Sequence, residues 1–192
     1  YLQGKGIIHR DLAARNVLVS KQESRYVVKI ADFGLSRAAT QAGGGGGDAA
    51  GGENFYAASS TREIPVKWSA PEVLRDGHYS HKSDVWAFAV LMWEVFEHGA
   101  MPFHYYSNRE AAEAVQRGER LERPAVCPDE VYQLMLRCWS EAPADRPAFD
   151  DIVAEVQRVY SELFRSSGKA AEQPGDARNA MFAGYEDFYN AD

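Results

Sequence analysis

Residues 83–96 constrain the fold most, because they combine the length of a helix with apolar side chains on nearly every face. The apolar members of this segment are Val85, Trp86, Phe88, Val90, Leu91, Met92, Trp93, Val95 and Phe96. A helix that is apolar all round is buried on all sides. Gly99 and Pro102 follow where such a helix would end. The segment therefore predicts a central helix with other elements packed around it.

Three further segments predict helices that are apolar on one face. Residues 108–117 and 129–139 are two of them, and the third contains apolar residues at three- and four-residue steps. These residues are Phe149, Ile152, Val153, Val156, Tyr160 and Leu163. Residues 17–19 and 27–30 predict two short strands joined by a polar turn at 20–26. The expected fold class is therefore mainly α, a helical lobe with one short β-hairpin.

Composition excludes several classes of function. The 192 residues, 45% of them hydrophobic, suffice for one well-cored domain and are too few for two full lobes. The net charge of -7 argues against nucleic acid as the main partner, because binding to phosphate backbones requires a basic surface. No apolar run approaches membrane-spanning length, and residues 1–4 lack the features of a signal peptide. We expect a soluble, cytoplasmic protein, with any membrane association made through regions outside this chain.

The cysteines and histidines predict no metal centre. Cys127 and Cys138 form no CxxC pair, so we expect buried thiols in a reducing compartment. Four histidines have no metal-ligand spacing with a neighbouring Cys or His, and surface or capping roles are expected for them. They are His78, His81, His98 and His104.

Two motifs near the predicted hairpin point to phosphoryl transfer. Residues 9–16 read H-R-D-L-x-x-x-N, and residues 32–34 read D-F-G. Phosphoryl transfer requires a carboxylate to orient the attacking hydroxyl and further oxygen ligands to hold magnesium against the phosphates. Asp11 would supply the first, and Asn16 and Asp32 the second. A hairpin between the motifs would bring them together.

With these motifs, the sequence resembles the protein kinase family over roughly residues 1–164. The resemblance continues through the triplets at 70–72 (A-P-E), 84–86 (D-V-W) and 145–147 (D-R-P). It implies the C-terminal lobe of a kinase catalytic domain, with ATP and Mg²⁺ as cofactors and proteins as substrates. No glycine-rich loop precedes the first motif, and its only upstream lysine is Lys5. We therefore expect the N-terminal lobe to be absent and the chain alone to be inactive.

The resemblance also implies roles for individual residues. Leu18 would form the floor of the adenine pocket, and His9 and Phe33 would be structural members of the two motifs. Asp84 would hold the backbone of the catalytic loop. Glu72 and Arg146 would form a buried ion pair.

The substrate class follows from the residues around the first motif. Ala13 occupies the position where a serine/threonine kinase typically has lysine, and the cation lies at Arg15. Pro65 and Trp68 belong to a segment similar to the substrate platform of tyrosine kinases. The resemblance therefore favours a tyrosine kinase in which Arg15 steadies the transferred phosphoryl group. The alternative is that Arg15 is a solvated surface charge and Trp68 a core anchor.

Within the tyrosine kinases, the chain looks most like the cytoplasmic Src, Tec and Csk groups. The similarity lies in residues 86–88, residues 120–124 and the position of Tyr56. A non-receptor kinase is therefore favoured, although receptor kinases share much of this pattern.

Residues 32–72 resemble an activation segment, in which Tyr56 is the expected regulatory phosphorylation site. A phosphate there would add negative charge that pairs with Arg10 and Arg37. The alternative is that the ring of Tyr56 simply packs. The glycine-rich residues at about 40–55 predict a flexible insert, because no phosphate-loop signature surrounds them.

Residues 165–192 predict a disordered acidic tail. Tyr185 and Tyr189 stand near acidic residues and resemble phosphorylation sites that a phosphotyrosine-reading domain would bind. An inert solvated tail is the alternative.

Two classes of function remain open at this point. The first is an ATP-dependent protein tyrosine kinase. The second is a pseudokinase or truncated interaction module that keeps the fold as a binding surface. Intact Asp11, Asn16 and Asp32 favour the enzyme, since a scaffold has no chemical need for all three.

Overall fold

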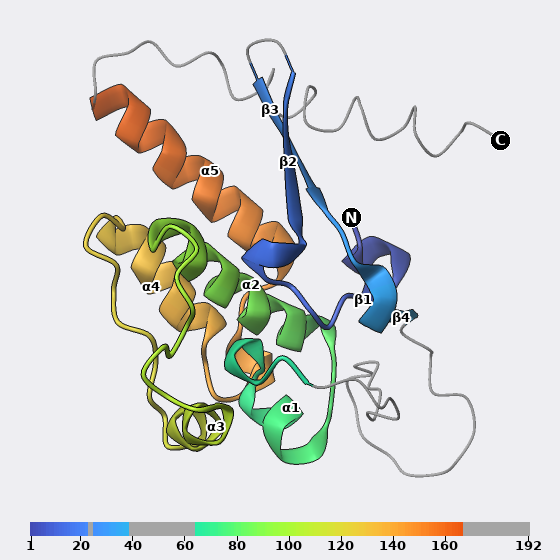
Figure 1. Ribbon diagram of the computed structural model, residues 1–192. Helices are drawn as coiled ribbons and strands as arrows, with labels where there is room; N and C mark the ends of the chain where they lie inside the picture. Colours follow the sequence, from blue (N-terminus) through green and yellow to red (C-terminus); the bar gives the residue numbers. More distant parts are fainter. Residues whose placement is uncertain (23–24, 39–63, 167–192) are drawn as a thin grey trace, which may run out of the picture. The chain divides into compact units, whose positions relative to one another are not determined.

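The computed structural model describes residues 1–22, 25–38 and 64–166 (Figure 1). The predicted insert at 40–55 lies outside the described residues. Arg165 and Ser166 are the last residues of a helix, and the remainder of the predicted tail is also outside them.

The chain divides into two compact units. The first contains residues 1–18 and 29–149, and the second contains residues 19–28 and those from 150 onward. Every residue of the site described below, apart from Leu18 at the edge of the hairpin, lies well inside the first unit.

Helix α2, His81–Phe96, is the central helix of the first unit and packs against α4, Asp129–Cys138 (Figure 1). It begins two residues before the predicted segment, because the Ser80 hydroxyl caps it by accepting the backbone N–H groups of Lys82 and Ser83. The segments around His9 and Trp68 also contact α2.

The prediction that α2 is buried on all sides is wrong at its C-terminal end. Val95 is 64% exposed, whereas the carboxylate residue Glu94 is only 5% exposed. Hydropathy assigned the inward positions correctly along most of the helix, but here a polar side chain faces inward because it has hydrogen-bond partners there.

The other helices are amphipathic or short. The predicted helices are confirmed as α3, Asn108–Gln116, α4, and α5, Phe149–Ser166. A further helix, α1, Pro71–Asp76, was not predicted. Proline at its first position and Gly77 with φ +68° after its last residue explain its short length.

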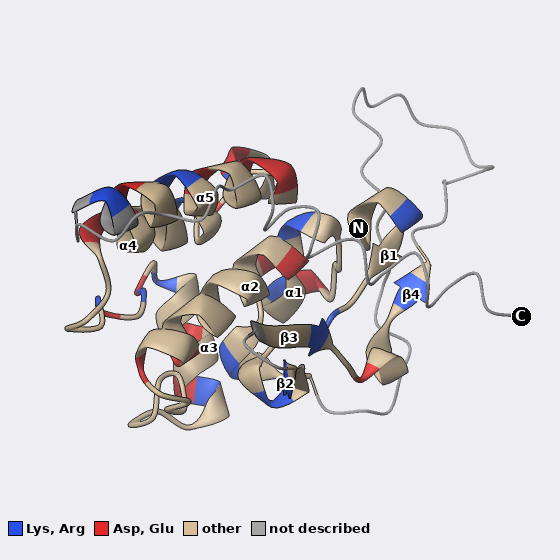
Figure 2. Cartoon of the chain, turned by 90° about the horizontal axis from the view of Figure 1, so that it is seen from above, with Lys and Arg blue, Asp and Glu red and all other residues tan. Residues whose placement is uncertain are grey.

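Charges are distributed along α5 in a way that stabilises this helix. Asp150 and Asp151 lie in its first turn and Arg165 in its last, where they complement the helix dipole (Figure 2). Arg158 also pairs with Glu162 one turn later at 2.9 Å.

The predicted hairpin is present as β2, Val17–Gln22, paired with β3, Arg25–Ile30. Its strands occupy most of the segment that was predicted as a turn. The described residues of β2 from Leu18 onward are exposed, and polar residues on an exposed ribbon resemble a turn in sequence.

A second strand pair was not predicted. Strand β1, Ile7–Ile8, pairs with β4, Arg37–Ala38, in antiparallel register, with Ile8 opposite Arg37. This pair joins the segment before the first motif to the segment after the second. The two motifs are thus held together by β1 and β4 as well as by the hairpin.

The described helices include none with the length and hydropathy needed to cross a membrane. Both cysteines are buried and neither forms a disulfide, which confirms the predicted burial of Cys127 and Cys138.

Candidate functional site

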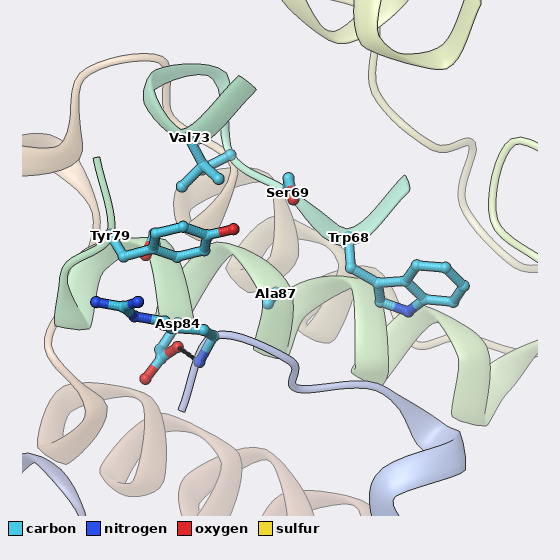
Figure 3. A pocket seen from close by; sticks show the side chains of 9 residues that line it. Trp68, Ser69, Val73, Tyr79, Asp84 and Ala87 are labelled. Atoms are coloured by element: carbon cyan, nitrogen blue, oxygen red, sulfur yellow. Dashed lines mark hydrogen bonds between the residues drawn. The ribbon is translucent and has the colours of Figure 1, made fainter. Parts of the chain in front are cut away.

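The backbone of the first motif is fixed by a buried carboxylate from α2. Asp84 accepts the backbone N–H of Arg10 at 2.9 Å through Oδ1 (Figure 3). Its Oδ2 accepts the backbone N–H of His9 at 2.7 Å. Arg10 has φ +72°, a conformation that a non-glycine residue adopts only when its surroundings impose it. The two hydrogen bonds from Asp84 supply that restraint.

Burial has a large effect on Asp84 itself. Loss of water around the carboxylate raises its pKa from 3.8 to about 7, although both backbone N–H groups and the nearby Arg10 charge oppose the rise. Burial of the Asp84 carboxylate therefore costs desolvation free energy. The hydrogen bonds from the backbone N–H groups of the loop that it positions offset part of that cost.

Asp11 is held by two residues of its own loop. Its carboxylate pairs with Arg15 Nη2, and its Oδ2 accepts the amide Nδ2 of Asn16 at 2.9 Å. Asn16 Nδ2 also donates to the backbone oxygen of Asp11 at 2.7 Å. The Asp11 side chain is 14% exposed. The carboxylate thus has a defined orientation and retains some access to solvent.

The second motif lies against His9. The rings of His9 and Phe33 meet edge to face at 5.0 Å between centroids. His9 Nε2 donates to the Ala31 carbonyl at 3.1 Å, and its Nδ1 accepts the Asp11 N–H at 3.3 Å. Burial lowers the pKa of His9, while the carboxylates of Asp11 and Asp32 raise it.

Asp32 has an unusual backbone conformation. It has φ +56°, and its Oδ1 accepts the backbone N–H of Gly34 at 3.1 Å. This local hydrogen bond turns the chain at the second motif and leaves the carboxylate exposed. The segment is tied to the first motif by the hydrogen bond from the Ala31 N–H to the Asn16 carbonyl, at 2.8 Å.

Trp68 connects the predicted substrate platform to the first motif. It ends a short helical turn, Val66–Trp68, and is 9% exposed. The guanidinium carbon of Arg15 lies 4.4 Å from the centroid of its ring. Arg15 is 44% exposed in its side chain, yet it is held between this ring and Asp11.

Sequence reasoning missed Glu94. Its Oε2 accepts both the indole Nε1–H of Trp68 and the backbone N–H of Ala14, each at 2.9 Å. The available signal was a single carboxylate in the middle of an apolar run. That signal identifies a buried acid but not its partners, which lie far away in sequence.

A small pocket lies where residues 68–73, Arg10 of the first motif and α2 meet (Figure 3). Its lining includes Arg10, Trp68, Val73, Tyr79 and Asp84. The Arg10 guanidinium carbon lies 4.7 Å from the Tyr79 ring centroid. Burial raises the pKa of Tyr79, and the Arg10 charge lowers it. We interpret this pocket as a gap in the packing around the first motif and not as a ligand site.

The remaining predicted residues lie in several places. Leu18 is 60% exposed on β2, and Pro65 immediately precedes the turn that contains Trp68. Arg37 is exposed on β4 and donates to the Ser36 carbonyl at 2.8 Å. The three predicted phosphorylation sites, Tyr56, Tyr185 and Tyr189, are outside the described residues.

Glu72 and Arg146 are brought together from distant parts of the sequence, and their side chains form an ion pair at 2.7 Å. In the described part of the chain, no group of three or more His, Cys, Asp or Glu side chains is arranged to hold a metal ion by itself.

Comparison with known proteins agrees with this geometry. Residues 1–156 match the family model described as protein tyrosine and serine/threonine kinase. The chain is 42% identical over 163 residues to tyrosine-protein kinase Fer of Rattus norvegicus, covering 85% of this chain and 18% of that protein. It is 45% identical over 175 residues to the megakaryocyte-associated tyrosine-protein kinase of the same species, covering 91% and 33%.

A viral relative gives the same result. The tyrosine-protein kinase transforming protein Fps of avian sarcoma virus is 48% identical over 163 residues, covering 82% of this chain and 28% of that protein. The chain thus spans at most about a third of the length of these relatives. It belongs to the protein tyrosine and serine/threonine kinase family, and its relatives identify it as tyrosine kinase catalytic domain sequence.

Proposed function

We propose that this chain transfers the γ-phosphoryl group of ATP to tyrosine hydroxyls of proteins, as part of a non-receptor tyrosine kinase. The observation that carries the proposal is the arrangement of Asp11. Its carboxylate is oriented by Arg15 and Asn16, and the start of its loop is fixed by Asp84. A partly exposed carboxylate in a fixed orientation suits a group that must meet an incoming hydroxyl.

Asp11 would orient the substrate phenol and accept its proton as phosphorus–oxygen bond formation proceeds. Proton transfer of this kind requires the carboxylate to lie within hydrogen-bond reach of the hydroxyl. The hydrogen bond from Asn16 and the ion pair with Arg15 reduce the number of orientations that the carboxylate can adopt. The Arg15 charge would also lie near the transferred phosphoryl group and steady it.

The oxygen donors of Asn16 and Asp32 fit Mg²⁺, which prefers carboxylate and carbonyl ligands and usually takes only one or two from the protein. Asn16 uses its amide nitrogen on Asp11, so its Oδ1 is the atom suited to a metal. Asp32 Oδ1 accepts the Gly34 N–H, so the Oδ2 atom of Asp32 is the second candidate ligand for the metal. When bound with ATP at these oxygens, Mg²⁺ would neutralise charge on the phosphates. Leu18 on β2 would contact the nucleotide base.

The preference for tyrosine would come from the contact between Arg15 and Trp68. A phenol places its hydroxyl farther from the peptide backbone than a serine does. The platform that includes Pro65 and Trp68 must therefore hold the backbone at a matching distance from Asp11. The contact at 4.4 Å couples that platform to the catalytic loop.

Partners and location are part of the same proposal. Substrates would be proteins with accessible tyrosines, and phosphorylated Tyr56 or Tyr185 would be bound by phosphotyrosine-reading domains. A cytoplasmic location follows from the resemblance to the cytoplasmic Src, Tec and Csk groups.

The proposal is tested by a transfer assay on the natural polypeptide that carries this sequence. Radiolabelled ATP is supplied with Mg²⁺ and either a tyrosine peptide or the same peptide with serine in that position. We expect labelling of the tyrosine peptide only, and loss of labelling when Mg²⁺ is chelated. Nucleotide binding without transfer to either peptide would instead support the pseudokinase alternative.

A further inference from the structure

Glu94 is a buried carboxylate in an unfavourable position. It is 5% exposed and lies in the last turn of α2, where the helix dipole presents negative charge. No basic residue occurs in that turn of α2, all of which is described. A buried charge is tolerated only when hydrogen bonds compensate for its lost hydration. The hydrogen-bond partners of Glu94 therefore show what this buried carboxylate holds in place.

These partners come from two separate segments. The Oε2 atom accepts the backbone N–H of Ala14, 80 positions away in sequence, at 2.9 Å. The same atom accepts the indole Nε1–H of Trp68, 26 positions away, also at 2.9 Å. Ala14 begins a short helical turn, so its N–H has no partner within that turn. One oxygen thus joins the catalytic loop to the predicted substrate platform.

Both hydrogen bonds fix groups that are next to Arg15. Ala14 is the residue immediately before it, and Trp68 supplies the ring over which its guanidinium lies at 4.4 Å. Arg15 in turn pairs with Asp11. The connected series Glu94, Trp68, Arg15, Asp11 runs from the buried helix to the catalytic carboxylate.

We infer that Glu94 is a positioning residue for the tyrosine substrate, an inference that rests on the proposed function. Its carboxylate is buried, so it would act through Ala14 and Trp68 and not by touching the substrate. It fixes the backbone from which Arg15 projects and the orientation of the indole beneath it. Loss of Glu94 would let the ring and the loop move independently, and misplacement of a substrate-positioning group reduces turnover even when no reacting atom is altered.

Steady-state kinetics of the natural polypeptide test this inference. Glu94→Ala removes both hydrogen bonds, and we expect kcat/KM for a tyrosine peptide to fall about tenfold or more while KM for ATP stays within about twofold. Glu94→Gln keeps an oxygen acceptor and should retain activity within about threefold of wild type. Glu97→Ala, three positions later on the same helix end, is the matched control and should stay within about twofold.

Trp68→Phe is the second variant, and it keeps the inference testable if Glu94→Ala does not fold. Phenylalanine leaves a ring beneath Arg15 but has no indole N–H, so we expect a fall in peptide kcat/KM of about threefold at unchanged KM for ATP. Wild-type peptide kinetics in folded Glu94→Ala or in Trp68→Phe would overturn the inference. So would a rise in KM for ATP as large as the loss of peptide kcat/KM.

The same assay separates this inference from the proposed function. If wild-type protein labels tyrosine peptide and the variants are unaffected, only the positioning role of Glu94 is rejected. If wild-type protein labels no tyrosine peptide, the proposed function is rejected and this inference with it.

Discussion

Arg146 donates Nη1 and Nη2 to the two carboxylate oxygens of Glu72, at 2.7 and 2.8 Å, across 74 positions of sequence. The Arg146 side chain is fully buried, and that of Glu72 is 10% exposed. Arg146 also donates to the carbonyls of Lys82 and Ser140, at 2.9 Å each. The guanidinium therefore ties α1 to the start of α2 and to the loop after α4.

Removing the carboxylate from this pair should strongly destabilise the fold. Glu72→Ala leaves a buried guanidinium without its counter-charge, and we expect the free energy of unfolding to fall by about 3 to 5 kcal/mol. Urea denaturation of the purified protein measures this change. Glu162→Ala is the control, because its partner Arg158 is 53% exposed and such pairs contribute about 0 to 1 kcal/mol. Equal losses in the two variants would contradict the assignment.

The buried carboxylate of Asp84 predicts a specific pH dependence of stability. Its pKa in the folded protein is about 7, above its ordinary value of 3.8, so the folded state binds this proton more tightly than the unfolded state. The stabilisation of the fold by this bound proton is complete below the unfolded pKa of 3.8 and is lost as pH rises through about 7. Between pH 5 and 8 the contribution of Asp84 to the free energy of unfolding falls by roughly 3 kcal/mol.

Asp84→Asn isolates that contribution, since asparagine does not titrate. We expect the difference in unfolding free energy between wild type and variant to change with pH over this range, with the wild type losing relative stability as pH rises. Denaturation curves at several pH values give the difference directly. Parallel pH profiles would show that Asp84 does not titrate near neutrality in the folded protein.

Much of the helical fold could be predicted from the sequence, because hydrophobic periodicity survives over segments as long as α3, α4 and α5. Short elements could not. The strands β1 and β4 contain two residues each, too few to show an alternating pattern, and they form only because they pair with each other. Helix α1 has six residues and little periodicity.

The residues of the site also fall into those that the sequence predicts and those that only the folded chain reveals. Asp11, Asn16 and Asp32 were predicted from motifs, since phosphoryl transfer requires those residue types at those spacings, and their roles stay predictions. Glu94 was missed because its role depends on two partners, Ala14 and Trp68, that only the folded chain brings to it. Its neighbour Val95 was expected to be buried and is exposed for the complementary reason, that the inward position is taken by the acid.

Phosphorylation of Tyr56 should increase activity through Arg37 and Arg10. Arg37 is exposed on β4, and its strand pairs with β1, which directly precedes the first motif. A phosphate carries about -1.5 to -2 charges and would bind these guanidinium groups. We expect Tyr56→Phe to remove the activity gained on incubation with ATP. Arg37→Ala should reduce the gain and leave the unphosphorylated rate unchanged.

Phosphotyrosine blotting alongside the peptide assay measures both effects for Tyr56. An undiminished blot and an undiminished gain of activity in Tyr56→Phe would reject this site. A gain that is lost in Tyr56→Phe but intact in Arg37→Ala would reject the proposed arginine partner only.

The rate of label transfer by Asp11→Asn tests the central claim most directly. Asparagine keeps the size of the side chain and a hydrogen-bonding oxygen but cannot accept the phenol proton, so we expect transfer from ATP to a tyrosine peptide to fall by about 10²- to 10⁴-fold. Asp76→Asn, on the exposed end of α1, should transfer label at the wild-type rate. A folded Asp11→Asn protein that transfers label as fast as wild type would contradict the account.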